Sequence, residues 1–229
     1  MYLTKYGMRE WLGSAVVVMV LVVALLCFVS YLNAAFFYVI IFLLMTVWLC
    51  IAAFFRDPER KINSDACSLV SPADGVVRDI EIIRNTEENT VFGGCEVIRI
   101  GIFLSVFNVH INRAPCHITV NKVVYKPGRF YDARDGRAIK ENESNAIVCT
   151  GDVNGRKFGV MVKQISGAIA RRIVCPVKEG DKFQKGQRYG MIKFGSRTEV
   201  YLPVCDYVKV AVQVGDKVKA GMSVIAQVR

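Results

Sequence analysis

Three short segments of the sequence hold side chains that could do chemistry together. Glycine precedes serine at Gly195-Ser196, between two β-like runs. Glycine lets the peptide distort, so the serine hydroxyl can reach the preceding carbonyl carbon, as backbone self-cleavage requires. A serine hydroxyl is a weak nucleophile until a base takes its proton. Asp74, in the segment 71–75, and His110 are the candidates for that base.

Each segment also has an ordinary structural interpretation. Ser71-Pro72-Ala73-Asp74-Gly75 is typical of a β-turn, with proline at the second position and glycine at its end. A Gly-Ser step between two strands is usually only a loop. His110 suits proton exchange near neutral pH, yet a buried structural histidine is equally compatible with its surroundings. The other histidine, His117, is interpreted as a strand residue. No single segment decides between the two interpretations.

A long apolar segment precedes these residues. Positions 11–55 contain no Asp, Glu, Lys or Arg, and a helix needs about 20 apolar residues to cross a bilayer. The segment therefore predicts two membrane-spanning helices, 11–32 and 34–55, joined by a tight turn. A cleaved signal peptide, the alternative, has a much shorter apolar core followed by polar sequence. We expect residues 1–55 to be a membrane anchor and 56–229 to be the catalytic domain.

The charges around this segment predict its orientation. Basic residues flank it on both sides, namely Lys5, Arg9, Arg56, Arg60 and Lys61. The positive-inside rule places both ends in the cytoplasm, so we expect the catalytic domain on the cytoplasmic face of the cell membrane. Of the formal net charge of +10, +9 belongs to residues 56–229, which suits an anionic membrane surface. Nucleic-acid binding is not predicted, because no compact basic run is interleaved with aromatic residues.

The eight cysteines predict neither a metal site nor a disulfide framework. None of them forms a C-x-x-C pair, the spacing that such sites favour. In a cytoplasmic domain they are expected to be reduced and mostly buried.

The sequence after the apolar segment predicts a compact, mostly β domain, a barrel or a sandwich. Short β-like runs separated by turn signals support this fold class. The runs are 75–83, 95–103, 117–125, 146–150, 158–164, 188–194, 199–201, 207–212 and 223–228. A short helix is predicted at 167–172.

An internal repeat adds detail to this prediction. The pattern V-x-x-G-D-K-(F/V)-x-x-G occurs at 177–186 and again at 212–221. Its Gly-Asp step is typical of a turn with positive φ. The repeat resembles the strand–turn units of biotinyl/lipoyl-like barrels. A non-enzymatic, membrane-tethered module that binds partners or carries a prosthetic group is therefore an alternative of a different class. No lysine stands at a hairpin tip in the setting that a carrier lysine needs.

Taken in order, the motifs resemble one enzyme family. S-P-A-D-G at 71–75, F-N-V-H-I-N-R-A-P at 107–115 and F-G-S-R at 194–197 follow an apolar hairpin, and F-F-R-D-P at 54–58 leaves it. This order and spacing resemble the short form of the phosphatidylserine decarboxylases, which are pyruvoyl-dependent carboxy-lyases made as proenzymes. The resemblance extends from about Phe54 to Arg229.

The resemblance implies a cofactor made from the chain itself. In the family the proenzyme cuts itself before a serine, here between Gly195 and Ser196, which leaves a large chain of 1–195 and a small chain of 196–229. Ser196 becomes a pyruvoyl group at the start of the small chain, and the two chains stay together as a heterodimer. The pyruvoyl ketone forms a Schiff base with the amine of phosphatidylserine and replaces pyridoxal phosphate as the electron sink. Loss of CO2 then gives phosphatidylethanolamine.

The resemblance also implies roles for other residues. Asp74 matches the aspartate that assists self-cleavage as a base, and His110 matches the histidine that handles a proton or positions the substrate carboxylate. Asn112 and Arg113 are candidates for binding the phosphate or the carboxylate, since a guanidinium suits both anions. Long-form relatives often have a second histidine where this chain has Arg113, and L-G-S-T at the cut.

Both departures look like the short form, and they leave open whether Asp74 acts alone or with His110. A serine phospholipid with other tails, such as archaetidylserine, is a further alternative because the reacting head group is the same.

Overall fold

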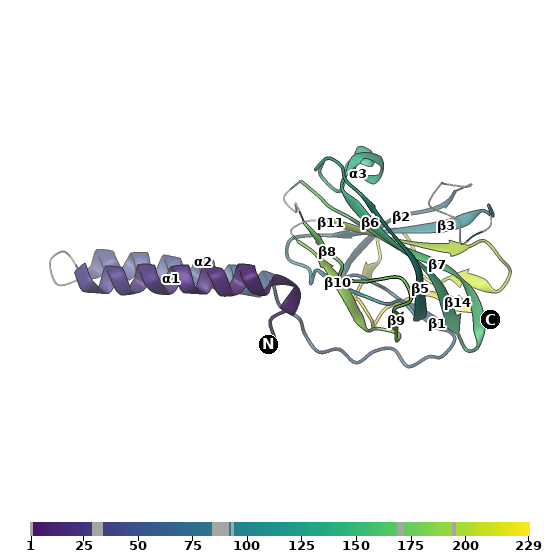
Figure 1. Cartoon of the computed structure of the whole chain (residues 1–229), viewed down its shortest axis with the longest axis horizontal. Coiled ribbons are helices and arrows are strands. Elements are labelled where there is room, and N and C mark those ends of the chain that lie inside the picture. Colours follow the sequence, from purple (N-terminus) through teal and green to yellow (C-terminus); the bar gives the residue numbers. More distant parts are fainter. Residues whose placement is uncertain (1, 29–33, 84–91, 93, 169–171, 194–195) are drawn as a thin grey trace. The chain divides into compact units, whose positions relative to one another are not determined.

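The computed structural model describes residues 2–28, 34–83, 92, 94–168, 172–193 and 196–229 (Figure 1). The chain divides into two compact units, Met1–Glu59 and Arg60–Arg229.

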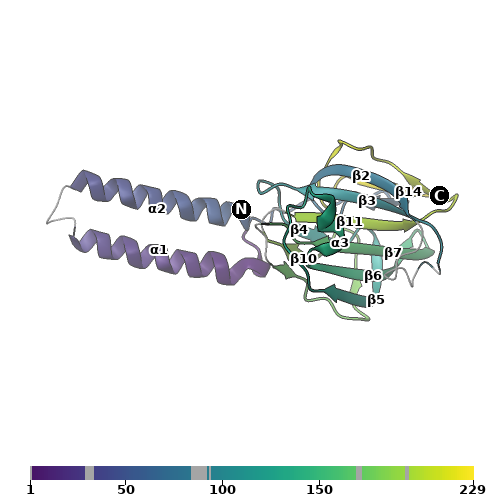
Figure 2. The same ribbon diagram turned by 90° about the horizontal axis from the view of Figure 1, so that it is seen from above.

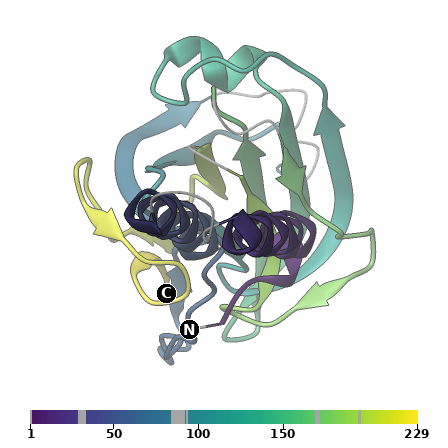
Figure 3. The same ribbon diagram turned by 90° about the vertical axis from the view of Figure 1, so that its left-hand side faces the viewer.

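The first unit contains two apolar antiparallel helices, α1 (Met8–Phe28) and α2 (Ala34–Phe54), preceded by a 3-10 turn, η1 (Lys5–Gly7) (Figures 2 and 3). Both helices are long and apolar enough to cross a membrane, with mean hydropathies of 2.4 and 2.6. Their side chains are largely exposed, so no protein core accounts for this apolar surface.

The chain segments at the open end of this helix pair are joined by hydrogen bonds. The N–H of Thr4 donates to the carbonyl of Phe55, and the N–H of Asp57 donates to the carbonyl of Tyr2. Phe55 is buried against Gly7, where a Cβ would collide with the phenyl ring. Glycine at position 7 therefore allows the two segments to pack closely.

The second unit is built from fourteen strands and one short helix in the part of the chain that the structure describes. Their bounds are β1 Ser68–Val70, β2 Gly75–Ile83, β3 Val97–Leu104, β4 Ile111–Arg113, β5 His117–Lys126, α3 Gly136–Glu141, β6 Ser144–Val153, β7 Arg156–Ile165, β8 Ile173–Val174, β9 Lys182–Phe183, β10 Arg188–Ile192, β11 Ser196–Pro203, β12 Val208–Val210, β13 Lys217–Val218 and β14 Val224–Val228. The prediction of a mostly β domain is confirmed.

The strands form one large sheet and two small ones. The eight-stranded sheet has the order β13-β2-β3-β11-β7-β6-β5-β9, and the three-stranded sheets are β4-β10-β8 and β1-β14-β12. Every named strand pair is antiparallel, and among the described residues the large sheet does not close into a barrel. Of the helix predicted at 167–172, residues 169–171 lie outside the described residues, and 167–168 are not helical.

Strand β11 lies in the middle of the large sheet and is buried on both faces. Val200 and Leu202 belong to the main apolar core, together with Ile100, Ile102 and Val162 from β3 and β7. Tyr201 belongs to a second apolar cluster on the opposite face. Because successive side chains alternate between faces, Ser196 lies on the same face as Val200 and Leu202. Burial of this apolar surface is the main force that holds the sheet together.

The two repeat units adopt matching structures at the two ends of the large sheet. Gly180 and Gly215 both have positive φ, 87° and 101°, as the Gly-Asp pattern predicts. The first unit supplies β9 beside β5, and the second supplies β13 beside β2. Their backbone hydrogen bonds also correspond, because Gly180 and Asp181 bond to Val120 whereas Gly215 and Asp216 bond to Val77. The domain thus contains a structural duplication.

Candidate active site

Ser196 is the first residue of β11, and its position defines one edge of the large sheet. It is fully buried and lies opposite Leu104, the last residue of β3. Strand β7 ends at the same edge with Ile165, opposite Arg197. We call this end of the sheet, where β11 begins and β3 and β7 end, the Ser196 edge. Gly195, the other residue of the predicted cut, lies outside the described residues.

The hydroxyl of Ser196 has no hydrogen-bond partner among the described residues. A buried hydroxyl that makes no hydrogen bond costs about 1–3 kcal/mol, so such a group calls for an explanation, such as a catalytic role, strain or an ordered water molecule. A nucleophile that must leave its position to attack a neighbouring carbonyl is one such explanation. This geometry is compatible with the predicted role of Ser196.

The turn that holds Asp74 lies at the same edge. It leads into β2, which pairs with β3 so that Val76 lies opposite Phe103. A Cβ at Gly75 would collide with the Phe103 carbonyl, so only glycine allows this close approach. Strand β3 thus lies between the start of β2 and the start of β11. The backbones at the start of β2 and the start of β11 are therefore two strand spacings apart, about 10 Å.

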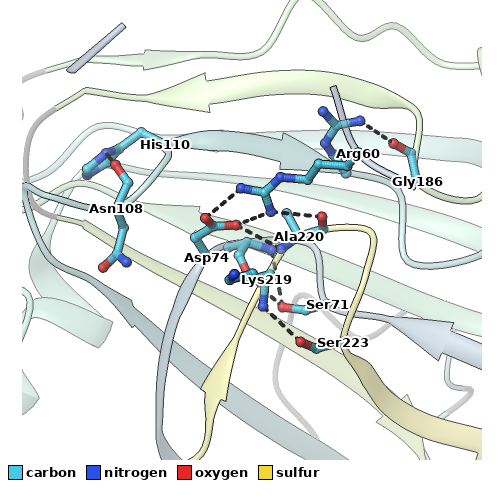
Figure 4. A network of polar contacts seen from close by, with 11 residues as sticks. Arg60, Ser71, Asp74, Asn108, His110, Gly186, Lys219, Ala220 and Ser223 are labelled. Atoms are coloured by element: carbon cyan, nitrogen blue, oxygen red, sulfur yellow. Dashed lines mark hydrogen bonds and ion pairs between the residues drawn. The ribbon is translucent and has the colours of Figure 1, made fainter. Parts of the chain in front are cut away.

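The Asp74 carboxylate is held by three hydrogen bonds (Figure 4). Arg60 binds it in a bidentate ion pair, with Nη1–Oδ1 and Nη2–Oδ2 distances of 2.5 and 2.7 Å. The N–H of Ala220 donates to Oδ1 at 2.8 Å, and Arg60 also donates to the carbonyl of Ala220 at 3.0 Å. Both charged side chains are more than nine-tenths buried. The carboxylate is therefore fixed in direction by groups from both ends of the chain.

His110 lies directly before β4 and is fully buried. Its Nδ1 is 2.9 Å from the carbonyl oxygen of Asn108 (Figure 4). A carbonyl only accepts hydrogen bonds, so Nδ1 carries a proton and Nε2 is the nitrogen that can take up or release one. The His110 carbonyl accepts from the N–H of Ile192, the last residue of β10. His110 is thereby tied to the strand that leads to the predicted cut.

Asn112 and Arg113 are both buried, in contacts with other parts of the domain. The Asn112 side chain donates to Thr198 Oγ1 at 3.0 Å and accepts from Gln164 Nε2 at 2.8 Å. It thereby connects β4 to β11 and β7. Arg113 donates to the carbonyl of Gly186 at 3.0 Å. These contacts support the arrangement of the strands, and the substrate-binding role of both residues stays a prediction.

A buried ion network next to Ser196 was not predicted from the sequence. Arg197 binds Asp79 through both terminal nitrogens, at 2.6 and 2.7 Å, and binds Glu199 through Nε at 2.8 Å. Arg197 and Glu199 are buried, and the Tyr201 hydroxyl donates to Glu199 at 2.7 Å. A Cβ at Gly101 would collide with the guanidinium. The network therefore fixes the residue that directly follows Ser196.

The charges of this network support one another. Burial alone would raise the pKa of the Asp79 carboxyl, but the hydrogen bonds and charges of Arg197 and Arg99 together outweigh this effect and lower that pKa. Burial alone would likewise lower the pKa of Arg197, and its two carboxylate partners raise it instead. The alternation of charged residues at 197 and 199 within a buried strand is the one local signal that could have revealed the network.

The sequence model of the family described as phosphatidylserine decarboxylase matches residues 48–226. The chain belongs to the phosphatidylserine decarboxylase family. The phosphatidylserine decarboxylase proenzyme of Desulfotalea psychrophila is 44% identical over 188 residues, which cover 82% of this chain and 83% of that protein. The proenzymes of Geotalea uraniireducens and Geobacter sulfurreducens are 45% and 46% identical over 181 residues; these cover 79% of this chain and 80% and 78% of theirs.

Membership of the phosphatidylserine decarboxylase family confirms the resemblance seen in the motifs and the enzyme class that it implied. The matched region includes the Asp74 turn, His110 and Ser196. Within the described residues no group of three or more His, Cys, Asp or Glu side chains could hold a metal ion.

Proposed function

We propose that this chain decarboxylates phosphatidylserine to phosphatidylethanolamine with a pyruvoyl group that it makes from Ser196 by self-cleavage. The observation that carries the proposal is the buried Ser196 hydroxyl, which has no hydrogen-bond partner among the described residues. It lies at the sheet edge shared with the Asp74 turn, in a chain of the phosphatidylserine decarboxylase family.

Self-cleavage begins with attack of the Ser196 hydroxyl on the carbonyl carbon of Gly195. The peptide C–N bond breaks, an ester forms, and the amide becomes the amine of Ser196. β-Elimination then removes the Cα proton of residue 196 and breaks its Cβ–Oγ bond, which releases residues 1–195 with a terminal carboxylate and leaves dehydroalanine at 196. Addition of water and loss of ammonia convert this residue to pyruvoyl. The ketone provides an electron sink for the loss of CO2 from the substrate.

Asp74 is the proposed base for the first step. Its ion pair with Arg60 and its hydrogen bond from Ala220 fix the direction of the carboxylate. The spacing of about 10 Å across two strands is the distance between the backbones, not between the two side chains. A general base can also act through one water molecule. His110 is proposed to handle a proton or position the substrate carboxylate through Nε2, since Nδ1 is held by Asn108.

The two chains are proposed to stay together after the cut. The small chain, 196–229, contains β11 to β14, and three of these strands pair with strands of the large chain. β11 pairs with β3 and β7, β13 with β2, and β14 with β1. The bond from Ala220 to Asp74 also joins the two chains. Separation would expose the core of the domain, which favours a stable heterodimer.

Residues 1–55 are proposed to anchor this enzyme in the cell membrane, with residues 56–229 as the catalytic domain on the cytoplasmic face. The two apolar helices support the anchor. The basic residues that flank them support the orientation.

Intact-mass spectrometry of the purified protein beside a Ser196→Ala variant tests the proposal. The expected result is two chains, with a small chain lighter by one ammonia than the peptide 196–229 that begins with unmodified serine. Ser196→Ala should stay uncut. Ser166→Ala is the matched control, because it removes another fully buried serine hydroxyl, and it should be cut normally. A single uncut wild-type chain would overturn the pyruvoyl mechanism and favour the binding module.

Activity on phosphatidylserine and archaetidylserine, presented in the same vesicles, then tests the lipid. Release of CO2 from phosphatidylserine by the cut protein, and none by Ser196→Ala, is the expected outcome.

A further inference from the structure

The loop between β3 and β4 exposes two apolar side chains beside the site. It starts after Leu104, which lies opposite Ser196, and leads to His110. Phe107 is 83% exposed and Val106 is 37% exposed. Phe107 has the most exposed large hydrophobic side chain among the described residues.

The loop is built to present these side chains. The Asn108 side chain accepts from both the N–H and the hydroxyl of Ser105, at 2.9 and 2.8 Å. The N–H of Asn108 also donates to the carbonyl of Ser105 at 2.9 Å. These bonds close a turn with Val106 and Phe107 at its tip. These bonds therefore hold two exposed apolar side chains at the tip of the turn. Contact with apolar material would remove their surface from water, which is favourable.

The end of the domain that carries the loop also has exposed basic and aromatic side chains. Arg172 is exposed, and its carbonyl accepts a hydrogen bond from the N–H of Lys193. Lys193 directly follows Ile192, whose N–H donates to the carbonyl of His110. Tyr125 is 59% exposed and lies at the end of β5 that reaches the Ser196 edge. Tyr125 is four strands from β3 in the sheet, so it belongs to the same end of the sheet rather than to the loop itself. Exposed basic and aromatic side chains at this end suit the headgroup region of an anionic bilayer.

We infer that Val106 and Phe107 insert into the bilayer and hold the active site at the depth of the lipid head groups. The inference rests on the proposed function, since a bilayer phospholipid must bring its serine head group to a fully buried Ser196. Transfer of a phenylalanine side chain from water to an apolar phase corresponds to about 10- to 100-fold in partitioning. The helices anchor the chain, whereas this loop orients the site.

The first test compares two forms of the substrate with the full, cut protein. Phe107→Ser should lower kcat/KM on phosphatidylserine in vesicles by about tenfold or more, mainly through KM. Its activity on monomeric short-chain phosphatidylserine should stay within about twofold. Ile82→Ser is the matched control, because Ile82 is 63% exposed and lies opposite Ile98, about 20 Å along β3 from Leu104. Equal loss on both substrate forms would overturn the inference.

The second test measures insertion without activity. Both native tryptophans, Trp11 and Trp48, lie in the apolar helices and are replaced by phenylalanine. Phe107→Trp is then introduced into the uncut Ser196→Ala chain, reconstituted in vesicles of anionic lipid. Its emission should shift to the blue and be quenched by brominated lipid tails, whereas Ile82→Trp should not respond. Absent quenching, or a blue shift without quenching, would mean that water or a protein surface covers the loop, and would overturn the inference independently of the cleavage chemistry.

Discussion

Replacement of Arg197 by methionine tests how the start of β11 is held in place. The substitution removes three hydrogen bonds and leaves Glu199, which is fully buried, without its closest cation. The remaining cation, Arg99, has its Nε 3.8 Å from Glu199. Removal of one partner from a buried ion pair costs about 3–5 kcal/mol. Because a protein is stable by only about 5–15 kcal/mol, the expected loss is a large share of the total.

Thermal unfolding of uncut chains measures this loss cleanly. In a Ser196→Ala background, Arg197→Met should lower the Tm by about 10 °C, since 1 kcal/mol corresponds to about 2–4 °C in a domain of this size. Arg134→Met is the matched control, because Arg134 and Asp132 form an exposed pair, with side chains 66% and 46% exposed. Such pairs contribute about 0–1 kcal/mol. Adding Glu199→Gln to Arg197→Met should recover part of the loss.

The same substitution also tests whether the network positions Ser196. With serine restored, Arg197→Met should slow self-cleavage at a temperature where the variant is still folded, and Arg197→Lys should restore part of the rate. Equal Tm values for Arg197→Met and Arg134→Met would refute the energetic reasoning. Unchanged cleavage in a destabilised variant would limit the network to a structural role.

Two further predictions concern Asp74 and the cysteines. Arg60→Met should slow self-cleavage by about tenfold or more, because loss of a hydrogen bond to a charged group costs about 1.5–3 kcal/mol and the Asp74 carboxylate loses its direction. A time course of chain cutting measures this beside the control Arg137→Met, which breaks an exposed ion pair. Equal cleavage rates in the two variants would contradict the prediction. Burial raises the pKa of Cys116 and Cys149 to about 12. Alkylation of the folded protein at pH 8 should therefore label the exposed Cys95 and leave these two thiols unmodified. Mass mapping that finds Cys116 and Cys149 labelled as fast as Cys95 would refute this prediction.

The sequence predicted the local features of the fold better than the contacts between distant segments. The runs at 75–83 and 117–125 match β2 and β5, and the Gly-Asp steps adopt the positive φ that the pattern indicated. These features depend on neighbouring residues. The run predicted at 199–201 covers only the middle of β11, which begins at Ser196. The rest of this strand was not predicted because charged residues do not indicate a buried strand. Their charges are neutralised by partners that meet them only in the folded domain.

The candidate site shows the same division. The order of the three motifs in the chain predicts Asp74, His110 and Ser196 as site residues, and their roles stay predictions. The ion network needed the register of β2, β3 and β11, in which Asp79 and Arg197 meet although 118 positions separate them. Arg60 was interpreted from the sequence as a charge that flanks the membrane. The structure shows that it also binds Asp74, a contact that no local pattern predicts.

The order of the large sheet extends the structural duplication of the two repeat units to two half-sheets, β13-β2-β3-β11 and β9-β5-β6-β7. In one half, β6 and β7 are joined directly, and Val153 lies opposite Arg156 across a tight turn at Asn154-Gly155. In the other half, the corresponding strands β3 and β11 end in the pair Leu104 and Ser196, but the chain does not pass from one to the other. A cut before Ser196 therefore opens no hairpin. The proposed cut before Ser196 would therefore place a new N-terminus at the start of a central strand that no tight turn joins to its neighbour β3.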